Sequence, residues 1–465
     1  MLQLFRQYHP LRNILFVIGE WVFFYLCFWL AAILLFDYSA FYKDHWLYFK
    51  ILIITSVCQA CLYYNDLYNL KEKFEYKKLY IHLFKAIGFS AILLWSISIF
   101  FQVSIITFSF FMMGTLLIAA LVVTFRLCYS VVLCRGLFNK RILLLGSGDL
   151  KKKICEEIDR RKDCGYSVIK EIPECIDEVN LDQPSCVPLT GVNFYKGLAE
   201  TCRQLCIHKI VVNFREKRDQ FPIRELLSCR VEGIDVVEGN TFYELLTGKL
   251  QVEYINPGWL IFSRGFEKSK FRRFSKRLFD LVVSITMMIL TLPLFLLAAV
   301  LIKLDSPGPV IFSQARVGER HRIYRMYKFR SMVRDAEKLT GPVWTEEKDS
   351  RITRVGRVMR RLRIDELPQL WNVIEGSMSF VGPRPEREVF VNELEKVVPY
   401  YRERFTVKPG ITGWAQVKYG YGASVADAIE KLNFDLFYIK NMSLGLDILV
   451  FILTIKVVLA RHGAR

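Results

Sequence analysis

The sequence predicts a membrane protein in three parts: an α-helical four-span bundle at residues 1–137, a Rossmann-like α/β domain at 138–265, and a second α/β domain with a re-entrant membrane helix at 266–465. Three observations predict this fold class. Four apolar runs fill the first part, strands alternate with helices around a glycine turn in the second, and an apolar run containing a proline opens the third. A chain of 465 residues is long enough for two or three domains.

The composition indicates a membrane surface and phosphorylated partners. Hydrophobic residues make up 52% of the chain, yet its formal net charge is +18. That combination suits a protein that contacts anionic lipid head groups and phosphorylated substrates from the cytoplasm. Nucleic acid is another common partner of basic proteins, but the long apolar runs argue against it. Several cysteines cluster between Cys155 and Cys229, which indicates a reducing cytosol around that region.

The four apolar runs of the first part are each about the 20 residues that a helix needs to cross a membrane. They cover residues 14–36, 46–64, 79–101 and 105–125. Lysines and arginines precede the first run, separate the second from the third, and follow the fourth. The positive-inside rule therefore predicts that both ends of the bundle face the cytoplasm. We expect no cleavable signal peptide, because the first run is too long for one.

A fifth apolar run, Leu281–Ile302, predicts a helix at 278–304 that enters one leaflet and returns to the same side. Basic residues flank it at both ends. Pro293 near its centre removes a backbone donor and clashes with the preceding turn, which bends a helix. The alternative is an ordinary Pro-kinked span. That alternative would place all later motifs outside the cell, away from nucleotide-activated substrates, so the re-entrant helix is favoured.

The middle part alternates strands and helices, which predicts a parallel sheet. Its first stretch, RILLLGSG at Arg141–Gly148, is a buried strand that runs into a glycine turn. The dinucleotide fingerprint is only partial, since Gly146 and Gly148 are present but Lys151 takes the place of the third glycine. A structural or regulatory domain is therefore favoured over an active dehydrogenase, and the ligand of this domain stays open.

Two adjacent acids, Asp365 and Glu366, directly follow the arginine-rich run Arg351–Arg363. An acid pair beside many cations suits an enzyme that holds a pyrophosphate, binds a divalent metal and attacks phosphorus. Arginines recur at every third position of the run and would form one basic face on a helix. Among them, Arg360 is the candidate for binding pyrophosphate and keeping Asp365 ionised. Adhesion to anionic lipid is the alternative use of this face.

Further candidates lie in three short motifs of the last part. Lys328 and Arg330 alternate with a phenylalanine in YKFRSM, so both charges lie on one side of a predicted strand. Arg384 stands between two prolines, in a stiff turn that can present its guanidinium to phosphate or nucleotide. Gln416 is a candidate for substrate contact, as is Trp414, although a buried Trp belongs at least as readily to the core.

From residue 272 onward, the chain resembles the bacterial sugar transferase family, whose members are monotopic phosphoglycosyl transferases. The resemblance rests on collinear motifs: KRLFD, GPVIFSQARVG, YKFRSM, RITRVGRVMRRLRIDELPQLWNV, GSMSFVGPRPE, VKPGITGWAQV and FDLFYIKNMSLGLDI. With the four spans and the middle domain, the whole chain is similar to the large form of the family, the polyprenyl-phosphate hexose-1-phosphate transferases. The segment YGYGASVADAIEKL resembles the subgroup linked to exopolysaccharide and exosortase systems.

The resemblance implies a reaction and a place in the cell. Asp365 would attack the sugar-bearing phosphorus of a UDP-sugar and expel UMP, and undecaprenyl phosphate would then attack the aspartyl phosphosugar. Glu366, together with Asp365, would hold Mg2+. Lys328 and Arg330 would lie at this site. The resemblance also implies a homodimer in the bacterial inner (cytoplasmic) membrane, with an α/β monotopic catalytic domain that contacts membrane lipids and faces the cytoplasm.

Two more expectations concern the third part. Many family members carry Ser directly before the re-entrant proline, where this chain has Leu292 preceded by Thr291, and a hydroxyl there can bond backbone groups freed at the bend. The apolar segment Leu444–Leu459 predicts a helix at the membrane interface, with the basic tail 461–465 toward lipid head groups. A helix packed within a soluble domain is the alternative.

Two other functions fit parts of the sequence. One is a membrane-anchored nucleotide-sugar dehydratase or epimerase that uses NAD in the middle domain. The other is an inactive membrane scaffold of polysaccharide export. The sequence also leaves the transferred sugar open among glucose, galactose and N-acetylated or deoxy-hexoses.

Overall fold

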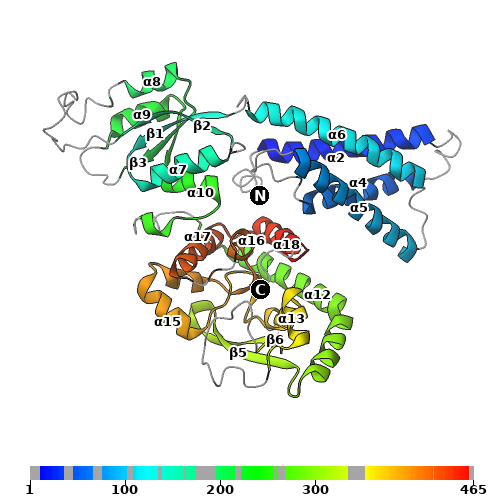
Figure 1. The fold of residues 1–465 in the computed structure, drawn as a ribbon. Helices are drawn as coiled ribbons and strands as arrows, with labels where there is room; N and C mark the ends of the chain where they lie inside the picture. The colour runs from blue at the N-terminus through cyan, green and yellow to red at the C-terminus, as the bar shows by residue number, and fades with distance from the viewer. Residues whose placement is uncertain are drawn as a thin grey trace. The chain divides into compact units, whose positions relative to one another are not determined.

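The structure is a computed structural model (Figure 1), and it describes residues 11–35, 46–65, 67, 76–101, 108–134, 139–161, 164–173, 195, 197–214, 221–255, 258, 265–266, 268–333, 351–420, 422 and 424–459. The chain divides into two compact units, Leu2–Phe242 and Tyr243–Arg465. Several of the loop charges used to orient the predicted spans, among them Arg6, Lys71 and Arg135, lie outside the described residues, as does the basic tail 461–465.

Helices form at all four apolar runs of the first part: α2 (Leu11–Leu35), α4 (Leu47–Tyr64), α5 (Tyr76–Phe101) and α6 (Phe108–Cys134). Three of them are long and apolar enough to cross a membrane, while the described apolar part of α6, Ser109–Thr124, is shorter. Phe28 packs on Phe110 in the core, with ring centroids 5.8 Å apart. Its ring also lies where a Cβ on Gly114 would stand, so a glycine is needed there for α2 and α6 to approach.

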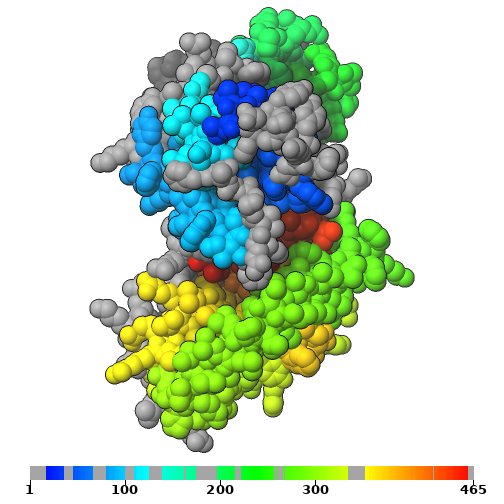
Figure 2. Space-filling model, turned by 90° about the vertical axis from the view of Figure 1, so that its right-hand side faces the viewer, coloured from blue at the N-terminus to red at the C-terminus, as the bar shows by residue number. Residues whose placement is uncertain are grey.

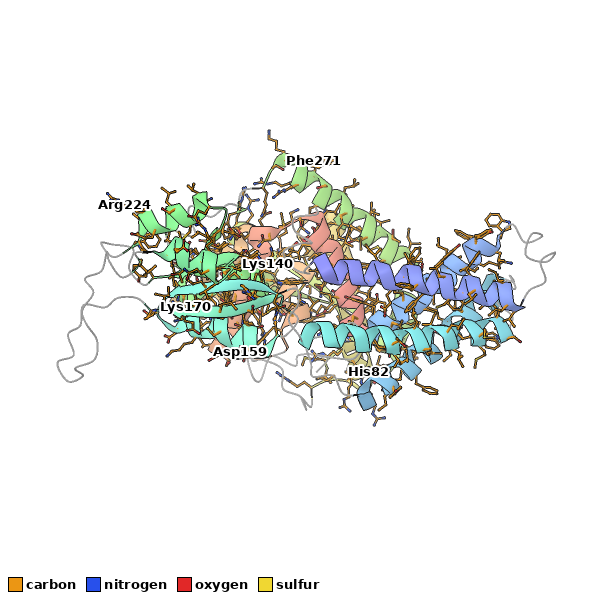
Figure 3. All side chains as sticks on the ribbon, turned by 90° about the horizontal axis from the view of Figure 1, so that it is seen from above. His82, Lys140, Asp159, Lys170, Arg224 and Phe271 are labelled. Atoms are coloured by element: carbon orange, nitrogen blue, oxygen red, sulfur yellow. The ribbon has the colours of Figure 1, made fainter. Side chains whose placement is uncertain are left out.

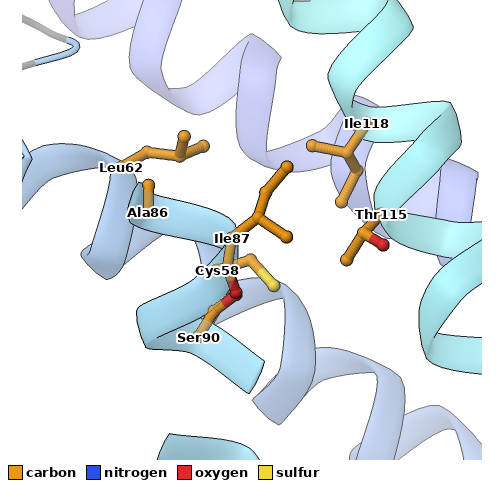
Figure 4. Close-up of a pocket in the computed structure, with 7 residues that line it drawn as sticks. All are labelled: Cys58, Leu62, Ala86, Ile87, Ser90, Thr115 and Ile118. Carbon is orange, nitrogen blue, oxygen red and sulfur yellow. The ribbon is translucent and has the colours of Figure 1, made fainter. Parts of the chain in front are cut away.

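A small pocket lies between α4, α5 and α6 (Figure 4), and the polar residues in its mostly aliphatic wall are Cys58, Ser90 and Thr115. The hydroxyls of Ser90 and Thr115 donate to carbonyls of their own helices, both at 2.8 Å. Small polar residues that satisfy themselves in this way allow membrane helices to pack closely. The pocket is therefore a packing feature of the bundle.

The rest of this unit is built on a parallel sheet in the order β2–β1–β3–β4. Its strands are β1 (Lys140–Gly146), β2 (Tyr166–Ile172), β3 (Lys209–Asn213) and β4 (Asp235–Glu238). Helices cover both faces (Figure 1): α8 (Leu198–Gln204) and α9 (Ile223–Val231) on one, α7 (Asp149–Arg160) and α10 (Gly239–Thr247) on the other. Because β1 and β3 are covered on both faces, their sequences are apolar. Charged residues such as Lys170 and Arg224 are exposed (Figure 3).

Asn213, at the end of β3, packs against the glycine turn that follows β1. Gly146 and Gly148 have φ of 104° and 106°, in the region that favours glycine. The Asn213 amide donates to the carbonyl of Ser147 (3.0 Å), and its backbone carbonyl stands where a Cβ on Gly146 would be. These two glycines therefore serve the turn and the close packing of β1 on β3.

The second unit contains one long helix, an antiparallel hairpin and a short parallel pair of strands. The helix is α12 (Lys270–Asp305), the hairpin β5 (Ile311–Val317) with β6 (Ile323–Phe329), and the pair β7 (Ser379–Val381) with β8 (Gly410–Thr412). The α-helices around them are α13 (Arg354–Arg361), α14 (Gln369–Glu375), α15 (Glu388–Val397), α16 (Trp414–Lys418), α17 (Val425–Asn441) and α18 (Leu444–Leu459).

This unit begins at Tyr243, and the domain boundary at 266 stays a prediction. Hydrogen bonds join the segment before α12 to the rest of the unit. The N–H of Leu250 donates to the carbonyl of Asn433 (3.0 Å), and the indole of Trp414 donates to that of Gly248 (2.8 Å). Trp414 is therefore buried in the core, which is the alternative that the sequence offered for it.

α12 is tied to this unit at both of its ends. Near its start, Arg277 donates to two carbonyls at the end of α14 (2.6 and 2.8 Å), and Asp280 accepts from the Ser379 hydroxyl in β7 (2.8 Å). At its end, the Asp305 carboxylate accepts from a backbone N–H in the first turn of α13 (3.0 Å). One folded unit therefore holds the helix at both ends.

Between these ends, α12 is apolar and open to the surface (Figure 2). Pro293 lies inside the helix, whose ribbon changes direction along its length in Figure 1. The Thr291 hydroxyl donates to the carbonyl of Met287 one turn earlier (2.7 Å), whereas the carbonyl that Pro293 frees is that of Ile289, four positions before it. Phe271 stands out at the start of the helix (Figure 3). The exposed apolar side chains of the middle are Val282, Ile285, Ile289, Leu290, Leu292, Leu296 and Leu297.

One face of α18 packs into the unit. Its buried Asp447 accepts from Lys276 (3.1 Å) and from the Tyr438 hydroxyl (2.6 Å), and the hydroxyls of Thr454 and Thr412 lie 2.7 Å apart. This face of α18 is therefore packed within the unit, as the alternative predicted. Its location at the membrane interface stays a prediction.

Arg330, just after β6, closes the C-terminus of α12. Its buried guanidinium donates to the carbonyls of Ser306 (2.6 Å) and Pro307 (3.1 Å) and to the Ser306 hydroxyl (3.0 Å). Carbonyls at the end of a helix have no partner within the helix. Arg330 supplies hydrogen-bond donors to these carbonyls and fixes α12 against the hairpin.

Replacing Arg330 by Lys is expected to lower the free energy of unfolding by about 2–4 kcal/mol, because an ammonium group cannot reproduce the fork and leaves buried carbonyls unpaired. Thermal unfolding of the purified full-length protein in detergent measures the effect. Arg325→Lys changes an exposed arginine of the same hairpin and is the matched control. Equal losses in the two variants would contradict the capping role.

Candidate active site

The two predicted acids lie at a buried turn between α13 and α14. Arg363 adopts a left-handed backbone (φ 58°) and reverses the chain after α13. A single 3-10 turn, η3 (Ile364–Glu366), then presents Asp365 and Glu366, each 7% exposed. The N-terminal turn of α13 packs closely on the segment that follows β6. A glycine is needed at position 356, because a Cβ there would collide with the carbonyl of Ser331. We call Asp365 and Glu366 the dyad.

Three cations hold Glu366. Its Oε1 lies 2.9 Å from the Arg384 guanidinium and 3.2 Å from Lys328 Nζ, and its Oε2 lies 3.7 Å from Arg363. Burial by itself would raise the pKa of Glu366, but the three cations outweigh it and hold that pKa well below its usual range. Glu366 in turn raises the pKa of Arg384. Glu366 is therefore a fixed anion.

Asp365 lies in different surroundings from Glu366. Its Oδ1 is buried and has no hydrogen-bond partner among the described residues. Burial raises the pKa of Asp365 and the charge of Glu366 raises it further, against the opposing charges of Lys328, Arg360 and Arg363. The net direction is upward, with burial as the largest cause. That the arginine run keeps Asp365 ionised stays a prediction.

The arginines of the predicted basic face differ in position. Arg360 donates from Nε to the Ser331 hydroxyl (2.9 Å), and its charge acts on Asp365. Arg354 and Arg357 are exposed on α13. The phosphate role therefore remains a prediction for Arg360, and lipid adhesion remains one for the exposed side of the helix.

Lys328 and Arg330 contact different partners in the structure. The place of Arg330 at the site, which the resemblance implied, stays a prediction. Lys328 reaches Glu366, whereas Arg330 turns to the end of α12. The alternation holds only while the strand continues, and β6 ends at Phe329, between the two residues.

The remaining predicted site residues are Arg384, Gln416 and Pro293. Arg384 contacts Glu366 directly. Gln416 donates to the carbonyl of Ile411 at 3.4 Å, and its Oε1 is buried without a hydrogen-bond partner in the described part of the chain. Pro293 belongs to α12. The sequence analysis did not single out Arg363, although its spacing of three residues from Glu366 was a usable signal.

The dyad fits the predicted Mg2+. Carboxylate oxygens are ligands that Mg2+ prefers, and this ion is commonly held by one or two carboxylates with water and substrate phosphates completing its shell. No group of three or more His, Cys, Asp and Glu side chains that could hold a metal gathers within the described residues. Because Glu366 is already paired with cations, the buried Oδ1 of Asp365 is the more available ligand atom.

The part of the chain that contains the dyad matches a known protein family. The model of the bacterial sugar transferase family matches residues 271–461. A UDP-N-acetylgalactosamine-undecaprenyl-phosphate N-acetylgalactosaminephosphotransferase of Aeromonas hydrophila is 44% identical over 242 residues, which are 52% of this chain and 56% of that protein. The exopolysaccharide production protein PSS of Rhizobium leguminosarum bv. phaseoli is 40% identical over 191 residues, covering 40% of this chain and 96% of that protein.

A longer match extends into the first unit. An undecaprenyl-phosphate galactose phosphotransferase of Salmonella typhimurium is 30% identical over 348 residues, 71% of this chain and 70% of that protein. By contrast, the chain spans little more than half (56%) of the Aeromonas protein. The family match runs from the start of α12 past the end of α18 and includes the dyad. The chain belongs to the bacterial sugar transferase family.

Proposed function

We propose that this protein transfers a sugar 1-phosphate from a UDP-sugar to undecaprenyl phosphate and releases UMP, and so starts the assembly of an exopolysaccharide or another glycan. One observation carries the proposal: a buried carboxylate with an available oxygen, Asp365, lies beside a Glu366 that three cations hold ionised. The names of the Aeromonas and Salmonella relatives support undecaprenyl phosphate as the acceptor.

The reaction proceeds in two displacements at one phosphorus. An Asp365 oxygen attacks the phosphorus that bears the sugar, and the bond to the bridging oxygen breaks, so that UMP leaves with the electron pair. An oxygen of undecaprenyl phosphate then attacks the same phosphorus, and the bond to Asp365 breaks to restore the carboxylate. A covalent intermediate divides one difficult transfer into two easier ones.

The remaining side chains serve the phosphates. Lys328, Arg360 and Arg384 surround the dyad and stabilise charge on the phosphate oxygens during transfer. Asp365 and Glu366 would hold Mg2+, which neutralises phosphate charge when it is bound. Asp365 and not Glu366 is the nucleophile, because Arg384 and Lys328 already bind Glu366 Oε1.

Asp365→Asn is expected to lower the rate of UMP release by at least about 10³-fold, since an amide cannot form the phosphosugar intermediate. UMP release from UDP-glucose, UDP-galactose and UDP-N-acetylgalactosamine is measured with undecaprenyl phosphate as acceptor. Glu375→Gln, which changes an exposed acid at the end of α14, is the control and should retain wild-type rates. Unchanged turnover in the Asp365 variant would remove this residue from the nucleophile role.

Incubation with a UDP-sugar but without acceptor is expected to leave a phosphosugar mass on the peptide that contains Asp365, because the second displacement cannot occur. Mass spectrometry of rapidly quenched digests detects the adduct. The addition of undecaprenyl phosphate should discharge it. An active enzyme that never carries the adduct would refute the covalent route.

We further propose that α12 is re-entrant, and that the protein lies in the bacterial inner membrane with its catalytic domain facing the cytoplasm. The helix has 36 residues and contains Pro293. If straight, it would be about 54 Å long, more than enough to cross the hydrocarbon of a bilayer. Its two ends nevertheless bind the same folded unit, through Arg277 and Asp280 at one end and Asp305 at the other. That arrangement favours both ends lying on one side.

Cysteines placed at Phe274 and at Leu304, two exposed positions near the ends of α12, are expected to react from the same side. Labelling with a membrane-impermeant maleimide in intact cells and in inverted vesicles measures this, in a background that lacks the other reactive cysteines. A cysteine at the exposed Trp46, at the predicted outer end of the second span, should react from the opposite side. Labelling of positions 274 and 304 from opposite sides would refute the re-entrant helix.

The two alternative functions are less well supported. A dehydratase would need a dinucleotide at the glycine turn, where Asn213 binds the turn and Lys151 replaces the third glycine. The proposed Rossmann-like domain is therefore assigned a structural or regulatory role. An inactive scaffold has no need of a buried acid pair, which is costly to keep without catalytic use. Homodimer formation remains part of the proposal.

A further inference from the structure

The segment after β7 is irregular, yet each carbonyl from Pro383 to Glu386 accepts a hydrogen bond from another part of the unit. The donors, in chain order of the acceptors, are the N–H of Gly410 (2.9 Å), the guanidinium of Arg404 (3.1 Å), the guanidinium of Arg316 (3.2 Å) and the N–H of Val317 (3.1 Å). Buried carbonyls normally have hydrogen-bond partners, and here the partners come from three separate stretches of the chain. Proteins use such external support where the position of a side chain matters.

The two guanidinium donors are themselves fixed. Arg404 is 6% exposed, lies 3.0 Å from the buried Asp435 carboxylate, and bonds the Tyr401 hydroxyl. Arg316 donates to Gln314 across 2.7 Å and lies 3.8 Å from Glu386. Arg404 is thus held by residues outside the Pro383–Glu386 segment. Arg316 is held by Gln314 and by the Glu386 side chain of the segment itself.

The segment depends on these donors because of its composition. Pro383 and Pro385 have no N–H, so the segment offers few donors of its own and is held mainly through its carbonyls. Between the prolines, Arg384 places its guanidinium 2.9 Å from Glu366. Gathering three guanidinium groups around one short stretch costs repulsion and desolvation, which a role in aiming Arg384 would justify.

We infer that Arg316 and Arg404 are positioning residues for Arg384: they hold the backbone of the Pro383–Glu386 segment so that Arg384 meets both Glu366 and the phosphate of the donor. The inference rests on the proposed function, in which Arg384 binds donor phosphate. Neither arginine needs to touch substrate. Both act through the carbonyls of the segment, at Arg384 for Arg404 and at Pro385 for Arg316.

The test is steady-state kinetics of the full-length enzyme, with the UDP-sugar that the wild type accepts as the varied donor. Arg404→Lys and Arg316→Lys keep the positive charge but remove the planar guanidinium and its several N–H donors. Each is expected to lower kcat/KM for the donor by roughly 10- to 100-fold, as a misplaced phosphate contact does. The KM for undecaprenyl phosphate should stay unchanged. Arg402→Gln, which removes an exposed arginine two positions before Arg404, should leave both parameters unchanged.

A double-mutant cycle with Arg384→Ala separates positioning from general destabilisation. If the two arginines act through Arg384, their replacement in that background lowers kcat/KM by no more than about twofold further. Losses that multiply in full would overturn the inference, as would single variants with wild-type kinetics. Thermal unfolding checks that each variant is folded, and Arg316→Lys carries the test should Arg404→Lys fail to fold.

The same measurements separate this inference from the function on which it rests. A wild-type protein that releases no UMP from any UDP-sugar would overturn the proposed function and this inference with it. An active wild type that loses activity with Arg384→Ala, but not with the two lysine variants, would overturn the inference alone.

Discussion

The ionised carboxylate of Glu366 is the constraint on which the site depends. A buried carboxylate is expensive unless cations and hydrogen bonds surround it. Its partners come from separate stretches of the chain: Lys328 from the hairpin, Arg363 from the turn after α13, and Arg384 from the segment between two prolines. Glu366 can be satisfied only when all of these stretches are in place, so the assembly of the unit and the completion of the site are one event.

Two neighbouring acids acquire different roles from their surroundings. Glu366 receives the close cations and is locked as an anion, while Asp365 keeps a buried oxygen that has no partner among the described residues and a raised pKa. Environments that push two carboxyl pKa values apart are a common way to divide labour within an acid pair. The division here follows from the contacts, since Arg384 and Lys328 bind Glu366 while Asp365 Oδ1 has no hydrogen-bond partner among the described residues.

Sequence patterns predicted the features that depend on local composition. Apolar runs indicated the helices, alternation indicated the parallel sheet, and the acids beside arginines indicated the dyad. Long-range contacts to backbone were beyond such patterns. Arg316 and Arg404 bind carbonyls 69 and 20 positions away, and a carbonyl is the same in every residue, so no residue type reveals the partner. Lys328 contacts Glu366 while Arg330 contacts the end of α12, because β6 ends between the two residues, and alternation alone does not reveal where a strand ends.

One short stretch joins the membrane helix to the site. Lys328 binds Glu366, Arg330 caps the end of α12, and Ser331 accepts from Arg360, all within a few residues of one another. The distance between the end of α12 and the dyad is therefore set by stiff, hydrogen-bonded backbone and not by a flexible linker. If α12 sits in one leaflet, the same stretch fixes how far the dyad lies from the membrane surface. In the proposed reaction, a carboxylate at a fixed distance from the membrane surface would meet the UDP-sugar and then undecaprenyl phosphate without moving between them.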